Sequence, residues 1–113
     1  MHALSVRQPW ASLIATGRKT IETRTWSTGY RGPLLICATA SNLNYPDLPC
    51  GVAVCRVKLV DCRPMTERDC DAAHTAMSNG LFAWVLADAV LVRPWRVRGR
   101  QGLFDVELPR LRR

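Results

Sequence analysis

The chain has few residues of the kind that hold metals. Its 113 residues include two histidines, and none of the five cysteines stands at C-x-x-C spacing from another. Because zinc sites need closely spaced cysteines and histidines, the pattern predicts no metal site. Neither histidine lies near a cysteine in the sequence, so a cysteine nucleophile is not expected. Cys37 and Cys55 fall within apolar runs and are predicted to be core residues.

Long apolar runs are absent as well. No stretch approaches the roughly 18 apolar residues that cross a bilayer, so no membrane partner is expected. The first residues show no basic segment followed by an apolar run, which predicts no signal peptide and a cytoplasmic location. Hydrophobic residues make up 48% of the chain, which is typical of a folded protein, and the length fits a single domain over residues 1–113.

Negative charge is scarce and unevenly distributed. Sixteen basic residues against nine acidic ones give a net charge of +7, and fourteen of the sixteen are arginines. Residues 1–46 contain five basic and one acidic residue, residues 47–92 four and six, and residues 93–113 seven and two. If the fold brings the two ends together, they form one basic face that attracts phosphate backbones. The charge favours a nucleic acid or a nucleotide as partner over a role in solubility alone.

The hydrophobic pattern predicts an α+β fold. Strands are predicted at residues 3–6, 19–26, 34–38, 51–62, 82–92 (as one bent strand or a pair) and 103–108. A helix is predicted between Pro9 and Gly17, and a second over residues 67–74, where Thr66 and Asp69 are placed for a capping box. About six strands with two or three short helices fit a small, partly closed β-barrel. Residues 109–113 are expected to form a frayed basic tail.

The predicted strand at 19–26 carries charge where a core strand would be apolar. Alternation places Thr20, Glu22, Arg24 and Trp26 on one face, and Lys19, Ile21, Thr23 and Thr25 on the other. Glu22 is the only acid among the first 46 residues. It could form a structural pair with Arg24 on the sheet surface. Alternatively, it could orient Arg24 or Lys19 in a ligand cleft and accept hydrogen bonds from a nucleobase amino group.

Four segments resemble the ASCH domain family. Gly17-x-Lys19-x-x-Glu22-x-Arg24 matches the signature G-x-K-x-x-E-x-R of that family. The segments Leu4 to Ala11, Tyr30 to Ile36 and Gly99 to Phe104 are also similar to small bacterial members, in the same order along the chain. The resemblance implies a PUA-like fold, which is a small β-barrel with a cleft beside its first helices. It also implies binding of RNA or another nucleic acid.

The resemblance implies a set of residues that contact single-stranded RNA or a modified base. Carried over from the family, the cleft involves Arg7, Gln8, Trp10, Lys19, Glu22 and Arg24, with Tyr30 and Arg31 at its rim. Either Trp10 or Trp26 is expected to support the face of a base, whereas Trp84 lies in an apolar run and is predicted to be core. An exposed strand face is expected for Arg93, Arg96, Arg98 and Arg100. This group either aids solubility or tracks the phosphate backbone, and Arg98 and Arg100 are the expected contacts.

A second interpretation is an enzyme that acts on RNA or a modified nucleoside, with Lys19 and Glu22 as catalytic groups. In a ribonuclease, Lys19 would stabilise charge and Glu22 would act as general base. In the amidohydrolase branch of the family, which acts on N4-acetylcytidine, a threonine nucleophile stands where this chain has Glu22, so that mechanism is disfavoured. A third interpretation is an adaptor whose basic face binds an acidic protein.

No paired carboxylates suggest a two-metal site. The acids around the second predicted helix are interpreted as solvated charge and caps: Asp61, Glu67, Asp69 and Asp71. No cofactor is therefore expected, except a divalent cation if the chain is a nuclease.

Overall fold

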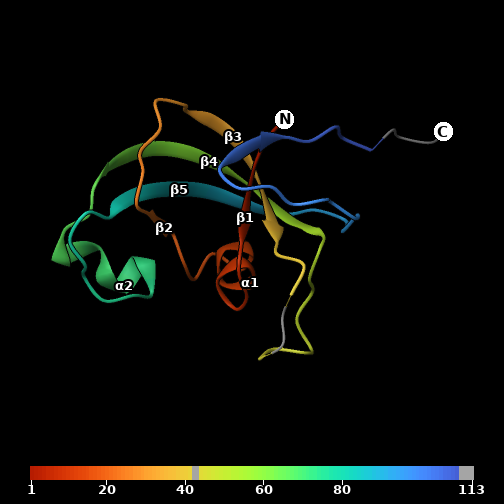
Figure 1. The fold of residues 1–113 in the computed structure, drawn as a ribbon, viewed down its shortest axis with the longest axis horizontal. Helices are drawn as coiled ribbons and strands as arrows, with labels where there is room; N and C mark the ends of the chain where they lie inside the picture. The colour runs from red at the N-terminus through yellow and green to blue at the C-terminus, as the bar shows by residue number, and fades with distance from the viewer. Residues whose placement is uncertain (42–43, 110–113) are drawn as a thin grey trace.

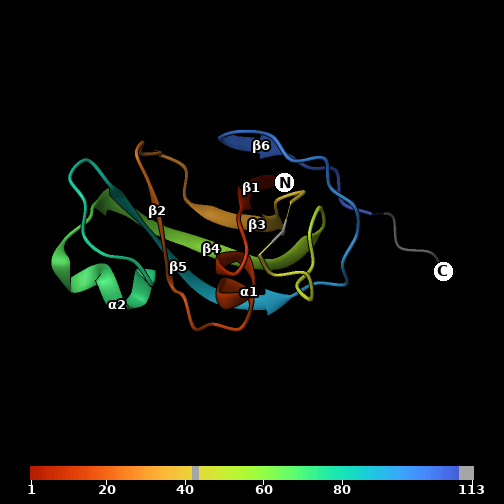
Figure 2. The same ribbon diagram turned by 60° about the horizontal axis from the view of Figure 1, so that its bottom comes forward.

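A single curled sheet of six strands carries the first helix on its inner side, and the second helix packs on the opposite face of the sheet, against the strands Ile21–Arg24 and Phe82–Leu91 (Figures 1 and 2). The computed structural model describes residues 1–41 and 44–109. Its elements are β1 (His2–Val6), α1 (Trp10–Ala15), β2 (Ile21–Arg24), β3 (Gly32–Ala38), β4 (Ala53–Pro64), a 3-10 turn (Glu67–Asp69), α2 (Cys70–Ala73), β5 (Phe82–Leu91) and β6 (Leu103–Asp105). The predicted α+β half-barrel is confirmed.

The sheet has the order β2-β5-β4-β3-β1-β6. β1 and β3 run parallel, and all other neighbouring strands are antiparallel. β5 is one bent strand, whose pairing with β4 shifts register twice. β6 ends at Asp105, so the strand predicted over residues 103–108 is shorter than expected. Residues 110–113 of the predicted tail lie outside the described residues.

Gly17 ends α1 and directs the chain into β2. Its φ of +78° lies in the left-handed region, where a side chain would be strained. The backbone N–H groups of Arg18 and Lys19 both donate to the carbonyl of Leu13 at 3.0 Å. β2 therefore starts only at Ile21, two residues later than the pattern predicts.

The core lies between α1 and the inner face of the sheet. Trp84 of β5 is fully buried, as predicted, and its indole N–H donates to the carbonyl of Trp26 at 3.2 Å. The two indole rings meet edge to face, with centroids 4.8 Å apart. Cys37 and Cys55 are also buried, and burial raises the pKa of these thiols to about 11 and about 12. Both thiols are therefore protonated core residues at neutral pH.

β4 alternates from Cys55 onward: Cys55, Val57 and Leu59 are buried in the inner core, whereas Arg56 and Lys58 between them are exposed. The alternation does not extend back to Ala53, which packs on the other face of the sheet. On the outer side of the sheet a smaller apolar cluster covers β1 and β3: Ala3, Leu35, Cys37, Ala53 and Phe104, with Trp95 and Val97 packed against it. No helix among the described residues is long and apolar enough to span a bilayer.

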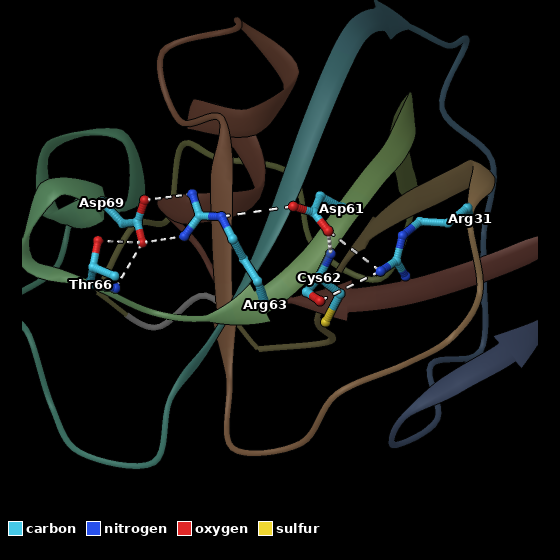
Figure 3. A network of polar contacts seen from close by, with 6 residues as sticks. All are labelled: Arg31, Asp61, Cys62, Arg63, Thr66 and Asp69. Carbon is cyan, nitrogen blue, oxygen red and sulfur yellow. Dashed lines mark hydrogen bonds and ion pairs between the residues drawn. The ribbon is translucent and has the colours of Figure 1, made fainter.

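A chain of ion pairs fixes the far end of β4 (Figure 3). Arg63 donates two hydrogen bonds to the carboxylate of Asp69, at 2.7 and 2.8 Å. The N–H of Thr66 donates to the same carboxylate at 2.8 Å, which confirms the predicted capping box. Asp61 lies between Arg31 and Arg63, at 3.5 and 3.8 Å.

Among the acids around the second helix, Asp69 has the predicted role of a cap, and its carboxyl group is buried, with Asp69 5% exposed. Its donors, first Arg63 and then Thr66, hold the pKa of the carboxyl group well below the ordinary value of 3.8. A carboxyl group whose pKa is lower in the folded state stabilises the fold above the ordinary pKa. That contribution is lost as the pH falls below this value.

We predict that Asp69→Asn lowers the free energy of unfolding at pH 7 by about 1–3 kcal/mol, the range for a hydrogen-bonded buried charge. The variant should also lose less stability than the wild type between about pH 4 and pH 2, because the carboxyl group that titrates there is gone. Chemical denaturation at a series of pH values measures both effects. Asp71→Asn is the control, since Asp71 is exposed two residues later, in α2. Equal pH dependence in both variants would contradict the assignment.

Candidate functional site

An open cleft of about 780 Å³ lies along β2, between the end of β1, the chain after α2 and the β5–β6 connection. Seven of the predicted site residues line it: Arg7, Trp10, Lys19, Glu22, Arg24, Trp26 and Arg100. The cleft therefore brings together side chains from both ends of the chain, as the charge distribution suggested.

Lys19 lies at the floor of the cleft and is 2% exposed. Its ammonium group donates to the carbonyl of Ile21 at 2.6 Å and to the carbonyl of Ala73, the last residue of α2. It also lies 3.4 Å from Oε1 of Glu22. Three donors thus meet three acceptors. Burial lowers the pKa of the Lys19 amine, and the carboxylate of Glu22 opposes that effect.

Glu22 in turn pairs with Arg24. The carboxylate of Glu22, itself buried, accepts a hydrogen bond from Nη2 of Arg24 at 2.9 Å. The same nitrogen donates to the carbonyl of Ser5 at 2.7 Å. Hydrogen bonds and ion pairs therefore connect α2 to β1 through three charged side chains, whose net charge is +1.

The predicted faces of the 19–26 segment are wrong for Lys19. Alternation separates Lys19 from Glu22, yet the two side chains meet in the floor of the cleft. Lys19 precedes β2, so the period of two does not reach it. The cleft also contacts the consecutive residues 22–26, because β2 is an edge strand with β5 as its only neighbour. The structural and the ligand-orienting interpretations of Glu22 are thus compatible, since its carboxylate is ion-paired and also lines the cleft.

The mouth of the cleft carries charge without counterions. Arg7 and Arg100 are exposed, and neither guanidinium has a hydrogen bond or ion pair with any described residue. Trp10 is 38% exposed and lines the cleft, whereas Trp26 is half-buried against Trp84. Trp10 thus offers the more accessible aromatic surface.

Four predicted contacts do not line the cleft, and the polar or aromatic groups of three of them, Gln8, Tyr30 and Arg31, have partners elsewhere in the fold. Gln8 is buried: its amide donates to the carbonyl of Pro49 at 2.8 Å, and its oxygen accepts the N–H of Ser12 at 3.0 Å. Tyr30 stacks on His2 with ring centroids 3.9 Å apart. Arg31 donates to backbone carbonyls and lies near Asp61. These side chains hold the fold rather than line the cleft.

The four arginines of residues 93–100 are exposed, as expected, but they do not lie on a strand. They follow β5 in an irregular connection, and only Arg96 forms an isolated bridge, with Val52. Arg100 lines the cleft and Arg98 does not.

Residues with hydroxyl groups complete the lining of the cleft, and none of them was predicted as a site residue. They come from Ser5, Thr23, Thr25, Thr39 and Thr75. The hydroxyl of Ser5 is buried and has no hydrogen-bond partner among the described residues. Thr39 and Thr75 lie in loops, where no periodic pattern could have indicated their position.

The arrangement can bind a ligand that has both polar and anionic groups. Its floor combines a carboxylate acceptor with guanidinium donors, and its mouth adds two cations and an indole. Among residues 1–41 and 44–109 no group of three or more histidine, cysteine or acidic side chains is placed to hold a metal ion.

We predict that Lys19→Met lowers the free energy of unfolding by about 3 kcal/mol, because it leaves buried polar partners without their cation. Arg18→Met is the matched control at an exposed neighbouring position, and it should stay within about 0.5 kcal/mol of the wild type. Urea denaturation measures both. A Lys19→Met protein as stable as the Arg18→Met protein would show that the ammonium does not support the fold.

Comparison with known proteins identifies the family. The family model described as the ASCH domain matches residues 4–95. Human and mouse proteins named activating signal cointegrator 1 are 38% and 35% identical over 80 aligned residues. The alignment covers 52% of this chain and 14% of each relative, so the chain spans only a small part of their length.

Solved structures agree with this result at the level of the fold. The ASCH protein from Zymomonas mobilis matches with a TM-score of 0.71 at 16% identity, over 94% of this chain and 87% of that one. A single-residue variant of the same protein matches with a TM-score of 0.68, over 94% and 89%. The chain therefore belongs to the ASCH domain family, which is PUA-like in fold and associated with RNA binding.

Proposed function

We propose that the chain binds RNA, either single-stranded or carrying an unusual base, with one nucleotide in the cleft. The observation that carries the proposal is that two unpaired guanidinium groups and an exposed indole line the same cleft. Arg7 and Arg100 supply charge for phosphates, and Trp10 supplies a surface on which a base can stack. The net charge of +7 supports the same class of partner.

The size of the cleft suits a single nucleotide. Its volume of about 780 Å³ falls in the range of roughly 300–1,000 Å³ that is typical of small-ligand sites. A duplex could not enter it, whereas a base from a single strand or a loop could be turned in. Proteins generally read RNA sequence from such unpaired bases.

The floor of the cleft would read the base edge. Glu22 offers carboxylate lone pairs to a base amino or imino group, and Arg24 offers guanidinium donors to a base carbonyl or ring nitrogen. In this scheme Lys19 supports the floor and does not touch the phosphate, because its donors are already occupied.

A second candidate, an enzyme that acts on RNA or a modified nucleoside, is favoured by the buried carboxylate of Glu22 beside Arg24. Glu22 could serve as a general base there, but each of its oxygens already lies near a cation, which weakens it in that role. Lys19 would first have to release a carbonyl or Glu22 before it could act on a substrate. The contacts of Lys19 and Glu22 in the structure therefore favour binding without turnover over catalysis.

We predict that Trp10→Ala weakens binding of single-stranded RNA about 5- to 100-fold, since stacking on an aromatic side chain contributes roughly 1–3 kcal/mol per base. Fluorescence anisotropy with end-labelled 12-nucleotide RNAs of mixed and homopolymeric sequence measures the loss. Tyr45→Ala is the control, because Tyr45 is 42% exposed and does not line the cleft. Equal losses in the two variants would contradict a stacking role.

The same reactions distinguish the binder from the enzyme. They are run with Mg²⁺, with Mn²⁺ and with chelator, and the RNA is examined on denaturing gels. An intact strand supports the binding module, whereas cleavage that Glu22→Gln abolishes would replace it with a ribonuclease. If no RNA binds or is cleaved, the RNA proposal fails, and modified nucleosides become the ligands to screen.

A further inference from the structure

The connection between β5 and β6 carries the densest positive charge among the described residues. Residues 92–102 contain Arg93, Arg96, Arg98 and Arg100 and no acidic residue. All four side chains are exposed, and none has a hydrogen bond or ion pair with a described residue. By contrast, three arginines elsewhere in the described residues, Arg24, Arg31 and Arg63, each pair with a carboxylate.

Backbone hydrogen bonds hold this connection against the sheet. The N–H of Ala53 donates to the carbonyl of Trp95 at 3.0 Å, and the N–H of Val97 donates to the carbonyl of Gly51 at 3.1 Å. The side chains of Trp95 and Val97 are half-buried in the outer apolar cluster. In an extended chain the intervening side chains point the other way, so Arg96 and Arg98 project from a fixed backbone into solvent.

The far end of the connection forms one wall of the cleft. Gly99, Arg100 and Gln101 all line it. Gly99 sits so close to β1 that a Cβ there would lie 2.8 Å from the hydroxyl oxygen of Ser5. The segment runs beside the sheet from β5 to β6 (Figure 2), and residues 99–101 at its far end line the cleft.

We infer that residues 93–100 form a phosphate track that carries the strand on one side of the nucleotide in the cleft, so that the ligand is an RNA strand and not a free nucleotide. The inference rests on the proposed function and adds the part of the ligand that lies outside the cleft. A row of unpaired cations on a fixed backbone neutralises successive phosphates at little cost, because no ion pair must be broken first. Solubility alone would not require the row to end in the wall of the cleft.

The test compares two charge-matched double variants. Arg96→Gln with Arg98→Gln removes two charges from the track and leaves the residues that line the cleft intact. Arg18→Gln with Arg68→Gln removes two exposed, unpaired arginines near α2 that do not line the cleft. Binding of a 12-nucleotide single-stranded RNA and of the four ribonucleoside monophosphates is measured over a series of salt concentrations.

The expected result is a loss of RNA affinity of about 5- to 20-fold at low salt for the track variant only. Its plot of log affinity against log salt should become less steep by about 1.4, because each phosphate contact on a single strand contributes about 0.7. Affinity for the monophosphates should not change. Circular dichroism and thermal melting confirm that both variants are folded.

The outcomes separate this inference from the proposed function. If the wild-type protein binds none of the RNAs, both are wrong. If it binds RNA and the two double variants have the same affinity and salt slope, the track is wrong and the binding proposal stands. If the track variant also loses the monophosphates in equal proportion, these arginines act in the cleft itself and the track is again wrong.

Discussion

The buried ammonium of Lys19 ties together the segments that make the floor of the cleft. It holds the end of α2 through Ala73 and holds Glu22 beside it, and Glu22 in turn fixes Arg24. Arg24 then bonds the backbone of β1 at Ser5. β2 and β1 are separated by three strands in the order of the sheet, so this contact crosses the open side of the half-barrel. The charged side chains thus help to set how tightly the sheet curls around the cleft.

Lys19, Glu22 and Arg24 contribute more to the geometry of the cleft than to the stability of the fold. Burying three charges costs solvation, and their mutual attraction with well-placed hydrogen bonds does little more than offset that cost. A fully satisfied polar network does, however, permit only one arrangement of its members. The remaining polar groups of Arg24 and Glu22 therefore line the cleft in fixed positions. Recognition of a small polar ligand depends on such preorganisation, since the protein does not have to order these side chains on binding.

Much of the fold follows from local patterns in the sequence. Alternation along β4, the left-handed Gly17 and the capping box at Thr66 each have a local cause, and each was predictable. Lys19 shows where such reasoning stops, because side-chain alternation holds only within a regular strand. Its contacts with Glu22 and Ala73 depend on the turn after α1 and on a helix 50 residues away. No periodicity in the sequence contains that information.

The residues of the site also fall into those whose role the sequence predicts and those whose role it does not. Residues of the signature motif could be assigned to the cleft because the family resemblance places them together. Gln8, Tyr30 and Arg31 belong to similar segments, yet the structure uses their polar groups for backbone hydrogen bonds and packing. A motif indicates that a residue is important, but it does not distinguish a residue that supports the fold from one that contacts the ligand. The hydrogen-bond and ion-pair partners of each side chain help to make that distinction, and those of Lys19 favour a supporting role.

The floor and the mouth of the cleft differ in their electrostatics. Under the proposed function, the two parts therefore contribute differently to binding. Charges at the floor are buried and already paired, so salt screens them weakly and they contribute mainly selectivity through hydrogen bonds. Arg7 and Arg100 at the mouth are exposed and unpaired, so they attract anions from a distance and are screened strongly by salt. A ligand that uses both must carry a phosphate next to a group with a definite donor and acceptor pattern. A nucleotide within a strand meets that requirement, because its phosphates and its base edge are held a fixed number of bonds apart.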